Sequence, residues 1–114
     1  AAIAAGIKIL EKKMGITDQD LSEVFLAGAF GNFIRRNNAV RIGLIPNIPF
    51  EKIKFVGNAA SLGAKLVLLC AALRNAVENI STKTECIELS LFSDFQNEFA
   101  ESMLFPNPTI KGKK

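Results

Sequence analysis

The chain has 114 residues, of which 49% are hydrophobic and 22% charged, so it can bury a core and is globular rather than disordered in composition. Its net charge of +3 depends on Lys111, Lys113 and Lys114 near the end, and no basic stripe or aromatic stacking platform is visible, which argues against a nucleic-acid partner. The chain has no His, and its two cysteines, Cys70 and Cys86, are far apart, so neither a zinc site nor an iron–sulfur site is predicted within it.

The first ten residues, AAIAAGIKIL, have a helical pattern with no initiator Met and no capping residue ahead of them. We therefore expect a fragment of a longer protein. The longest apolar run, 66–73, is far shorter than the roughly 20 residues that span a bilayer, and there is no signal-peptide pattern. These features predict a cytoplasmic location and no membrane partner.

Helical spacing of apolar residues predicts a first helix that Gly15 ends, because glycine readily takes the left-handed conformation found after helices. Residues 17–20, TDQD, resemble a capping box that starts a short turn. The continuous apolar run at 23–29 is typical of a buried strand. The predicted inner face of the first helix consists of Ile3, Ile7, Leu10 and Met14.

The middle of the chain predicts a short helix over 37–44 and a second buried strand over 53–57. A long helix is expected from about residue 59 to residue 80. It is apolar nearly all round at its start, which predicts burial between layers. Within it, Cys70 is interpreted as a small core hydrophobe.

Near the end, partial alternation over 86–92 predicts a third strand at a sheet edge. Ser93 is expected to cap a last helix whose inner face carries Phe95, Phe99 and Met103. Residues 106–114 are expected to form a flexible basic tail. Together the elements predict an α/β fold in which helices cover a small sheet of about three strands.

Two segments rich in small residues, 28–32 and 57–60, each follow a predicted buried strand. Ligands of open α/β folds bind beyond the carboxyl ends of strands, where glycine lets the backbone come close. The second segment also begins a helix, and backbone N–H groups at a helix N-terminus suit a phosphate or another polar ligand. Neither segment is a Walker loop or a G-x-G-x-x-G, so both could equally be turn and packing residues, with Asn32 and Asn58 as turn formers.

A cluster of three arginines, Arg35, Arg36 and Arg41, lies between these two segments. The cluster could contact nucleotide phosphates or an acidic partner. We favour a solvated face, because exposed charges rarely have a specific role.

Several uncommon segments occur in one order: LAGAFGNFI, AVRIGLIP, IKFVGNAASLGAKL and SDFQNEFAESMLFP. In this order and spacing they resemble the C-terminal subdomain of the reductive activators of corrinoid proteins. The resemblance runs over nearly the whole chain to Pro106. It implies that residues 1–105 are a piece of an actin-like ATPase domain of ribonuclease H-like fold, from the superfamily of acetate and sugar kinases, heat-shock chaperones and actin.

The resemblance also implies a function and a site. The activators use ATP to drive the uphill reduction of cob(II)alamin to cob(I)alamin on a corrinoid partner. The adenosine side of their nucleotide site would fall on Gly28, Ala29, Phe30, Gly31, Asn32, Gly57, Asn58, Ala59 and Ala60. The chain would hold ATP or ADP with Mg at a partial site, whereas the iron–sulfur cluster would lie in another part of the parent protein. Catalysis by this piece alone is not expected.

The partners implied are a corrinoid protein and the remainder of the actin-like domain, with a homodimer as a further option. Two alternatives stay open. The chain could be a docking or dimerisation lobe with no nucleotide binding of its own, or it could belong to an activator of a different redox enzyme, such as a dehydratase.

Overall fold

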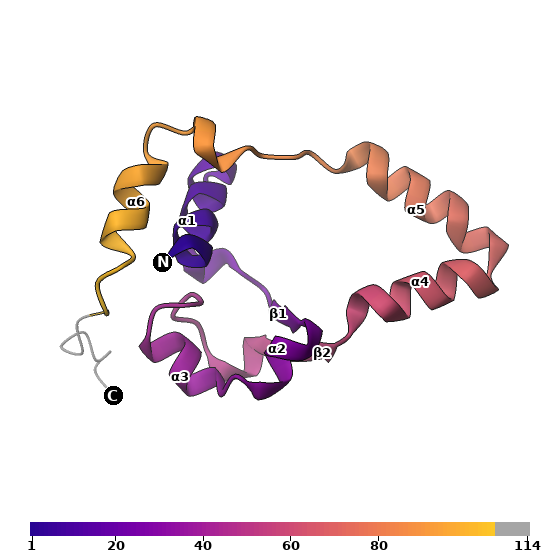
Figure 1. The fold of residues 1–114 in the computed structure, drawn as a ribbon, viewed down its shortest axis with the longest axis horizontal. Helices are drawn as coiled ribbons and strands as arrows, with labels where there is room; N and C mark the ends of the chain where they lie inside the picture. The colour runs from indigo at the N-terminus through magenta and orange to yellow at the C-terminus, as the bar shows by residue number, and fades with distance from the viewer. Residues whose placement is uncertain (107–114) are drawn as a thin grey trace. The chain divides into compact units, whose positions relative to one another are not determined.

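The computed structural model describes residues 1–106, with only the backbone of 30–32 (Figure 1). The expected basic tail therefore lies outside the described residues from residue 107 on. The elements in chain order are α1 (Ala2–Met14), η1 (Asp18–Asp20), β1 (Val24–Ala27), α2 (Gly28–Phe33), α3 (Arg36–Arg41), η2 (Phe50–Lys52), β2 (Ile53–Gly57), α4 (Ala59–Leu69), α5 (Ala71–Lys83), η3 (Leu89–Leu91) and α6 (Phe95–Glu101).

The sheet of the described residues has two parallel strands, β1 and β2, and the connection between them contains α2, α3 and η2. The predicted α/β class is therefore confirmed. β2 has the predicted bounds, but Ile53 is its one buried residue, so the prediction of a buried strand is wrong for the rest of it. β1 is shorter than predicted and half-buried rather than fully buried, with 58% of Phe25 exposed.

The predicted third strand over 86–92 is wrong. The structure has irregular backbone there, followed by the 3-10 helix η3. A strand needs a hydrogen-bonding neighbour, and a local alternation of apolar residues cannot supply one. Leu89 instead packs at Gly6 of α1, where an added Cβ would lie 3.3 Å from the leucine Cδ1 atom.

The described chain divides into two compact units. Unit 1 comprises 1–24, 34–53 and 88 onward, and unit 2 comprises 25–33 and 54–87. The buried apolar core lies in unit 1 and consists of Ala5, Ile9, Ala39, Ile45, Ile48 and Ile53. Complete burial of a side chain such as Ile9 or Ile53 contributes roughly 1.5–3 kcal/mol.

Helix α1 ends at Gly15, whose φ of 66° is the predicted left-handed conformation, and the capping box at Thr17 and Asp20 is present. The inner face predicted for α1 is wrong, because its buried residues are Ala5, Gly6 and Ile9. Gly6 lets the Leu89 side chain approach the helix closely, which a larger residue at this position would hinder.

Helix α6 has the predicted location and packs against α1 (Figure 1). Its rings at Phe95 and Phe99 lie 6.1 Å apart between centroids. Asp94, rather than the predicted Ser93, is the N-cap residue, and its side chain makes no capping hydrogen bond. Met103 lies beyond the helix and is 60% exposed, so its predicted place on an inner face is wrong.

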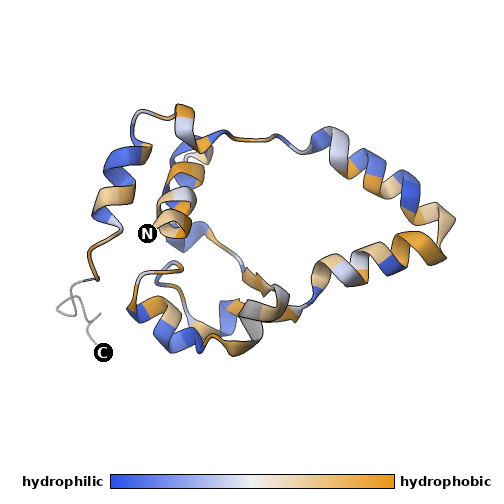
Figure 2. Ribbon diagram, in the orientation of Figure 1, coloured by the Kyte–Doolittle hydropathy of each residue, from blue (hydrophilic) through white to orange (hydrophobic). Residues whose placement is uncertain are grey.

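The single buried helix predicted over 59–80 is two helices, α4 and α5, and neither has a buried residue. The break occurs at Cys70, whose backbone is extended and whose side chain is exposed, so its core role is wrong. Arg74 Nε donates to the Val67 carbonyl near the end of α4, at 3.3 Å. Figure 2 shows that most of α4 is apolar. Among residues 1–106, no helix combines the length and the apolar character needed to cross a bilayer.

Candidate functional site

The two predicted ligand segments lie at the carboxyl ends of β1 and β2. Gly28 directly follows β1 and begins α2, while Gly57 ends β2 and Asn58 caps α4. Because β1 and β2 are parallel hydrogen-bonded neighbours, both segments lie at the same edge of the sheet. Both also belong to unit 2. The fold thus brings together two segments that are separated by 24 residues or more in the sequence.

The two glycines at this edge have conformations that other residues rarely adopt. The φ angle is 84° at Gly28 and 63° at Gly57. A Cβ atom added at either position would meet nothing within 4 Å. Glycine is therefore required there by the backbone conformation and not by crowding, and the space beside each glycine is open to a ligand.

The N-terminus of α4 combines a structural cap with accessible small residues. Asn58 Oδ1 accepts a hydrogen bond from the Ser61 N–H at 3.0 Å, and the Asn58 carbonyl accepts one from the Leu62 N–H at 3.1 Å. Asn58 is thus a helix cap, which fits the interpretation as a turn former. Ala59 and Ala60 are exposed, and first-turn N–H groups have no acceptor within their own helix.

The first segment forms the short helix α2. Gly28 is half-buried and Ala29 is exposed. Phe30, Gly31 and Asn32 lie within α2, but their side chains fall outside the described residues. The nine predicted residues include no ionisable side chain. The chemistry available at this edge is therefore binding through backbone groups and shape, without acid–base catalysis.

A groove of about 650 Å³ extends from the same helix start along α4 and α5. It includes Ala59 and Ala60 of the predicted site and is lined mainly by small and apolar residues. Its charged lining residue, Arg74, was missed by the sequence interpretation. Arg74 reaches α4 only because the chain turns at Cys70, and no glycine or proline marks that turn in the sequence. The groove residues are Ala59, Ala60, Gly63, Ala64, Val67, Leu68, Arg74 and Val77.

The arginine cluster belongs to unit 1 rather than to the unit that carries the glycine segments. Arg35, Arg36 and Arg41 are all exposed, as the interpretation as a solvated face predicts. Arg36 donates to the Phe50 carbonyl at 3.4 Å, so it also has a structural contact. Within residues 1–106, no group of three or more His, Cys, Asp or Glu side chains could hold a metal ion.

Comparison with known proteins shows what the chain is similar to. The family model described as the C-terminal domain of RACo, the ASKHA domain, matches residues 1–112. The corrinoid activation enzyme RamQ of Eubacterium limosum is 39% identical over 108 residues, covering 92% of this chain and 18% of that protein. A solved structure of a reductive activator for corrinoid, iron–sulfur protein superposes with a TM-score of 0.84 at 31% identity, covering 91% of this chain and 17% of that one. The chain thus spans less than a fifth of either relative.

Proposed function

The chain belongs to the family of the C-terminal ASKHA domain of RACo, and from this membership we propose that it contributes the adenosine side of a nucleotide site to an ATP-dependent reductive activator. The relatives are named as activators of corrinoid proteins, which supports a corrinoid protein as the partner and argues against a dehydratase. The observation that carries the proposal is the meeting of two glycine segments at one edge of the parallel sheet.

In this proposal, the whole activator transfers one electron to cob(II)alamin and thereby forms cob(I)alamin on the corrinoid partner. The electron comes from an iron–sulfur cluster held by another part of the activator. Such a cluster typically needs four cysteine ligands, and this chain has two cysteines, which are 16 positions apart. The use of ATP by the actin-like domain supplies the energy for this unfavourable step. The chain itself binds and orients the nucleotide and performs no chemical step.

The residues at the sheet edge fit an adenosine. The space beside Gly28 and Gly57 lets a flat ring and a ribose approach the backbone. The first turn of α4 offers N–H groups and a positive partial charge to ribose or phosphate oxygens. The nine residues contain no carboxylate, so Mg would be held by the nucleotide phosphates and by residues outside this set.

A titration of the chain with adenosine and with Mg-ADP, followed by backbone amide NMR shifts, tests the proposal. We expect saturable shifts confined to 28–32 and 57–60. An Ala60→Phe variant should abolish them, because the ring would fill the space at the start of α4. The matched control is Ala72→Phe, which adds the same ring at an exposed position of α5.

Two outcomes contradict an autonomous site. One is that no amide moves up to millimolar ligand. The other is that both Phe variants bind the nucleotide as the unaltered chain does. A third variant, Asn58→Ser, separates the cap from the ligand contact, because serine also caps helices well. Loss of binding with α4 intact would assign Asn58 to the nucleotide.

A second candidate function is docking without autonomous nucleotide binding. The observation that favours it is the exposure of large apolar side chains on α4 and α5, including Leu62 at 58%, Leu66 at 46% and Leu69 at 83%. Such a surface marks a contact site. The occupant would be the remainder of the actin-like domain or a second copy of the chain. Sedimentation analysis with a Leu66→Glu variant would detect self-association, because a buried charge at that contact would make the chain monomeric.

A further inference from the structure

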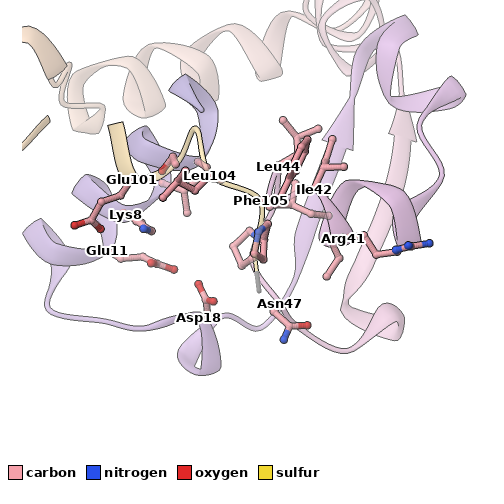
Figure 3. A pocket seen from close by; sticks show the side chains of 18 residues that line it. Lys8, Glu11, Asp18, Arg41, Ile42, Leu44, Asn47, Glu101, Leu104 and Phe105 are labelled. Carbon is pink, nitrogen blue, oxygen red and sulfur yellow. The ribbon is translucent and has the colours of Figure 1, made fainter. Parts of the chain in front are cut away.

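Unit 1 contains a second cavity, of about 780 Å³, that shares no residue with the glycine segments (Figure 3). It is bounded by α1, by Asp18, by the end of α3 with the residues that follow it (40–47) and by the segment 101–106. Its volume is in the range of sites that bind small molecules.

One part of this cavity is apolar. Ile7, Leu44, Leu104 and Phe105 contribute to its lining, and 75% of Leu104 and 78% of Phe105 are exposed. These side chains offer a surface for an apolar body, whose burial is favourable in proportion to the area removed from water.

The other part is acidic. Glu11 and Asp18 line the cavity, and Figure 3 shows their carboxylates directed toward one another. The Oε1 atom of Glu11 is buried and has no hydrogen-bond partner. Burial, followed by the hydrogen bond and the charge of Asp18, raises the pKa of Glu11 to about 6, while Lys8 acts in the opposite direction. The two carboxylates therefore lack full compensation by a cation.

Of the positive groups nearby, Lys8 and Lys12 pair with Glu98, and Arg41 is directed away from the two carboxylates. Lys8 Nζ lies 3.2 Å from Glu98 Oε2. Arg41 lines the cavity, but Figure 3 shows its guanidinium directed away from the two carboxylates. Glu101 adds a third acidic side chain to the lining. The charge of the cavity thus favours a cation. Since the described residues offer no metal-binding group of three, that cation would be organic.

We propose that this cavity binds an organic cation with an ammonium or guanidinium head and an apolar body. The head lies beside the Glu11–Asp18 pair, where it donates to the Asp18 carboxylate that lines the cavity. The body lies against Ile7, Leu44 and Phe105. A charge-assisted hydrogen bond to a partly buried carboxylate gives the head its selectivity. The proposal is independent of nucleotide binding at the sheet edge.

Three probes with the same apolar body test it: hexylammonium, hexanol and hexanoate. At pH 7.5 we expect hexylammonium to bind the chain at least ~10-fold more tightly than hexanol, from the typical strength of hydrogen bonds to charged groups. Hexanoate should bind most weakly. The measurement is the shift of backbone amides that line the cavity. Equal binding of hexylammonium and hexanol would overturn the proposal, as would preferred binding of hexanoate.

Two variants and one control locate the site. Glu11→Gln and Asp18→Asn should each remove most of the preference for hexylammonium. Glu51→Gln makes the same change of charge at an exposed residue outside the cavity and should leave the preference unchanged. If Glu51→Gln has the same effect as Glu11→Gln, the attraction is general and the site is refuted.

The dependence on pH provides a test that needs no variant. At pH 5 Glu11 is largely protonated, so hexylammonium should bind several-fold more weakly than at pH 7.5, while hexanol should be unaffected. The other charged groups around Glu11 are Asp18, Lys8, Lys12, Glu98, Glu101 and Arg41. An unchanged affinity for hexylammonium between the two pH values would overturn the role of Glu11.

Discussion

The Lys12 ammonium lies 2.6 Å from Oε1 of Glu98, although the two residues are 86 positions apart. Lys8 lies 3.2 Å from the other carboxylate oxygen. Only 13% of the Glu98 side chain is exposed, compared with 54% of Lys12. The hydrogen bond from Lys12 is the main cause that holds the pKa of Glu98 below its usual value. Helices α1 and α6 therefore pack against each other and are also joined by charge.

Glu98→Gln keeps the shape of the side chain and removes its charge. We expect the free energy of unfolding at pH 7 to fall by about 1 kcal/mol, a typical value for a partly exposed ion pair. Urea denaturation of both proteins measures the change. The control is Glu101→Gln, which removes the charge of an exposed residue on the same helix. Equal losses in both variants would show that the contacts with Lys8 and Lys12 contribute nothing.

The same ion pair predicts a dependence of stability on pH. Because the pKa of Glu98 is lower in the folded chain than in the unfolded one, its contribution is present above the ordinary pKa of about 4.5. It is lost as the pH falls through the folded value. Urea midpoints between pH 7 and pH 3 should therefore fall more for the unaltered chain than for Glu98→Gln.

Glu11 should give the opposite dependence of stability on pH. Its pKa is raised to about 6 in the folded chain, so its protonated form stabilises the fold, and that contribution is lost as the pH rises from about 4.5 to 6. At pH 7, Glu11→Gln should raise the free energy of unfolding by about 1 kcal/mol, a value reduced for solvent screening. At pH 4.5 the variant and the unaltered chain should unfold at the same urea concentration. A destabilised variant at pH 7 would contradict the assignment.

Glycine-to-alanine changes at two positions should have opposite effects. Gly57→Ala places a Cβ on a residue with a φ of 63°, which costs roughly 1–2 kcal/mol although nothing lies within 4 Å. Gly63→Ala lies within α4, also with nothing within 4 Å, and should stabilise the chain by roughly 0.5–1 kcal/mol. Thermal unfolding of both variants checks the signs. Destabilisation by Gly63→Ala would show a close contact at this face of α4.

Truncation of two branched apolar residues tests where the core lies. Ile9 is 2% exposed, so Ile9→Ala should cost about 2–5 kcal/mol through lost burial and a cavity. Leu69 is 83% exposed, so Leu69→Ala should change stability by less than about 0.5 kcal/mol. Denaturation in urea compares the two. A large loss for Leu69→Ala would mean that α4 is covered in solution by another copy of the chain.

Local signals in the sequence were sufficient for several elements. The glycine at position 15 and the capping box at 17–20 predicted where α1 ends and η1 begins, because both depend only on neighbouring backbone groups. The apolar run at 53–57 predicted β2 with its bounds. The order of four motifs predicted the family, which the match over residues 1–112 bears out.

Features that depend on contacts between distant parts of the chain could not be predicted from local sequence patterns. Periodicity predicted α1 but not which of its faces is buried, since Gly6 faces Leu89 only in the folded chain. The run at 86–92 has the alternation of a strand but no neighbouring strand to bond with, and the break at Cys70 has no local breaker.

Some features of the candidate site, too, follow from the sequence, and others follow only from the tertiary structure. The sequence by itself determined which two segments carry the glycines, because turns that need a positive φ depend on residue type alone. Only the tertiary structure decided that both segments lie at one edge of the sheet, that Arg74 joins the adjoining groove, and that Glu11 faces Asp18. The physical reason is that strand pairing and burial are set by contacts between residues far apart in the sequence, which no local pattern contains.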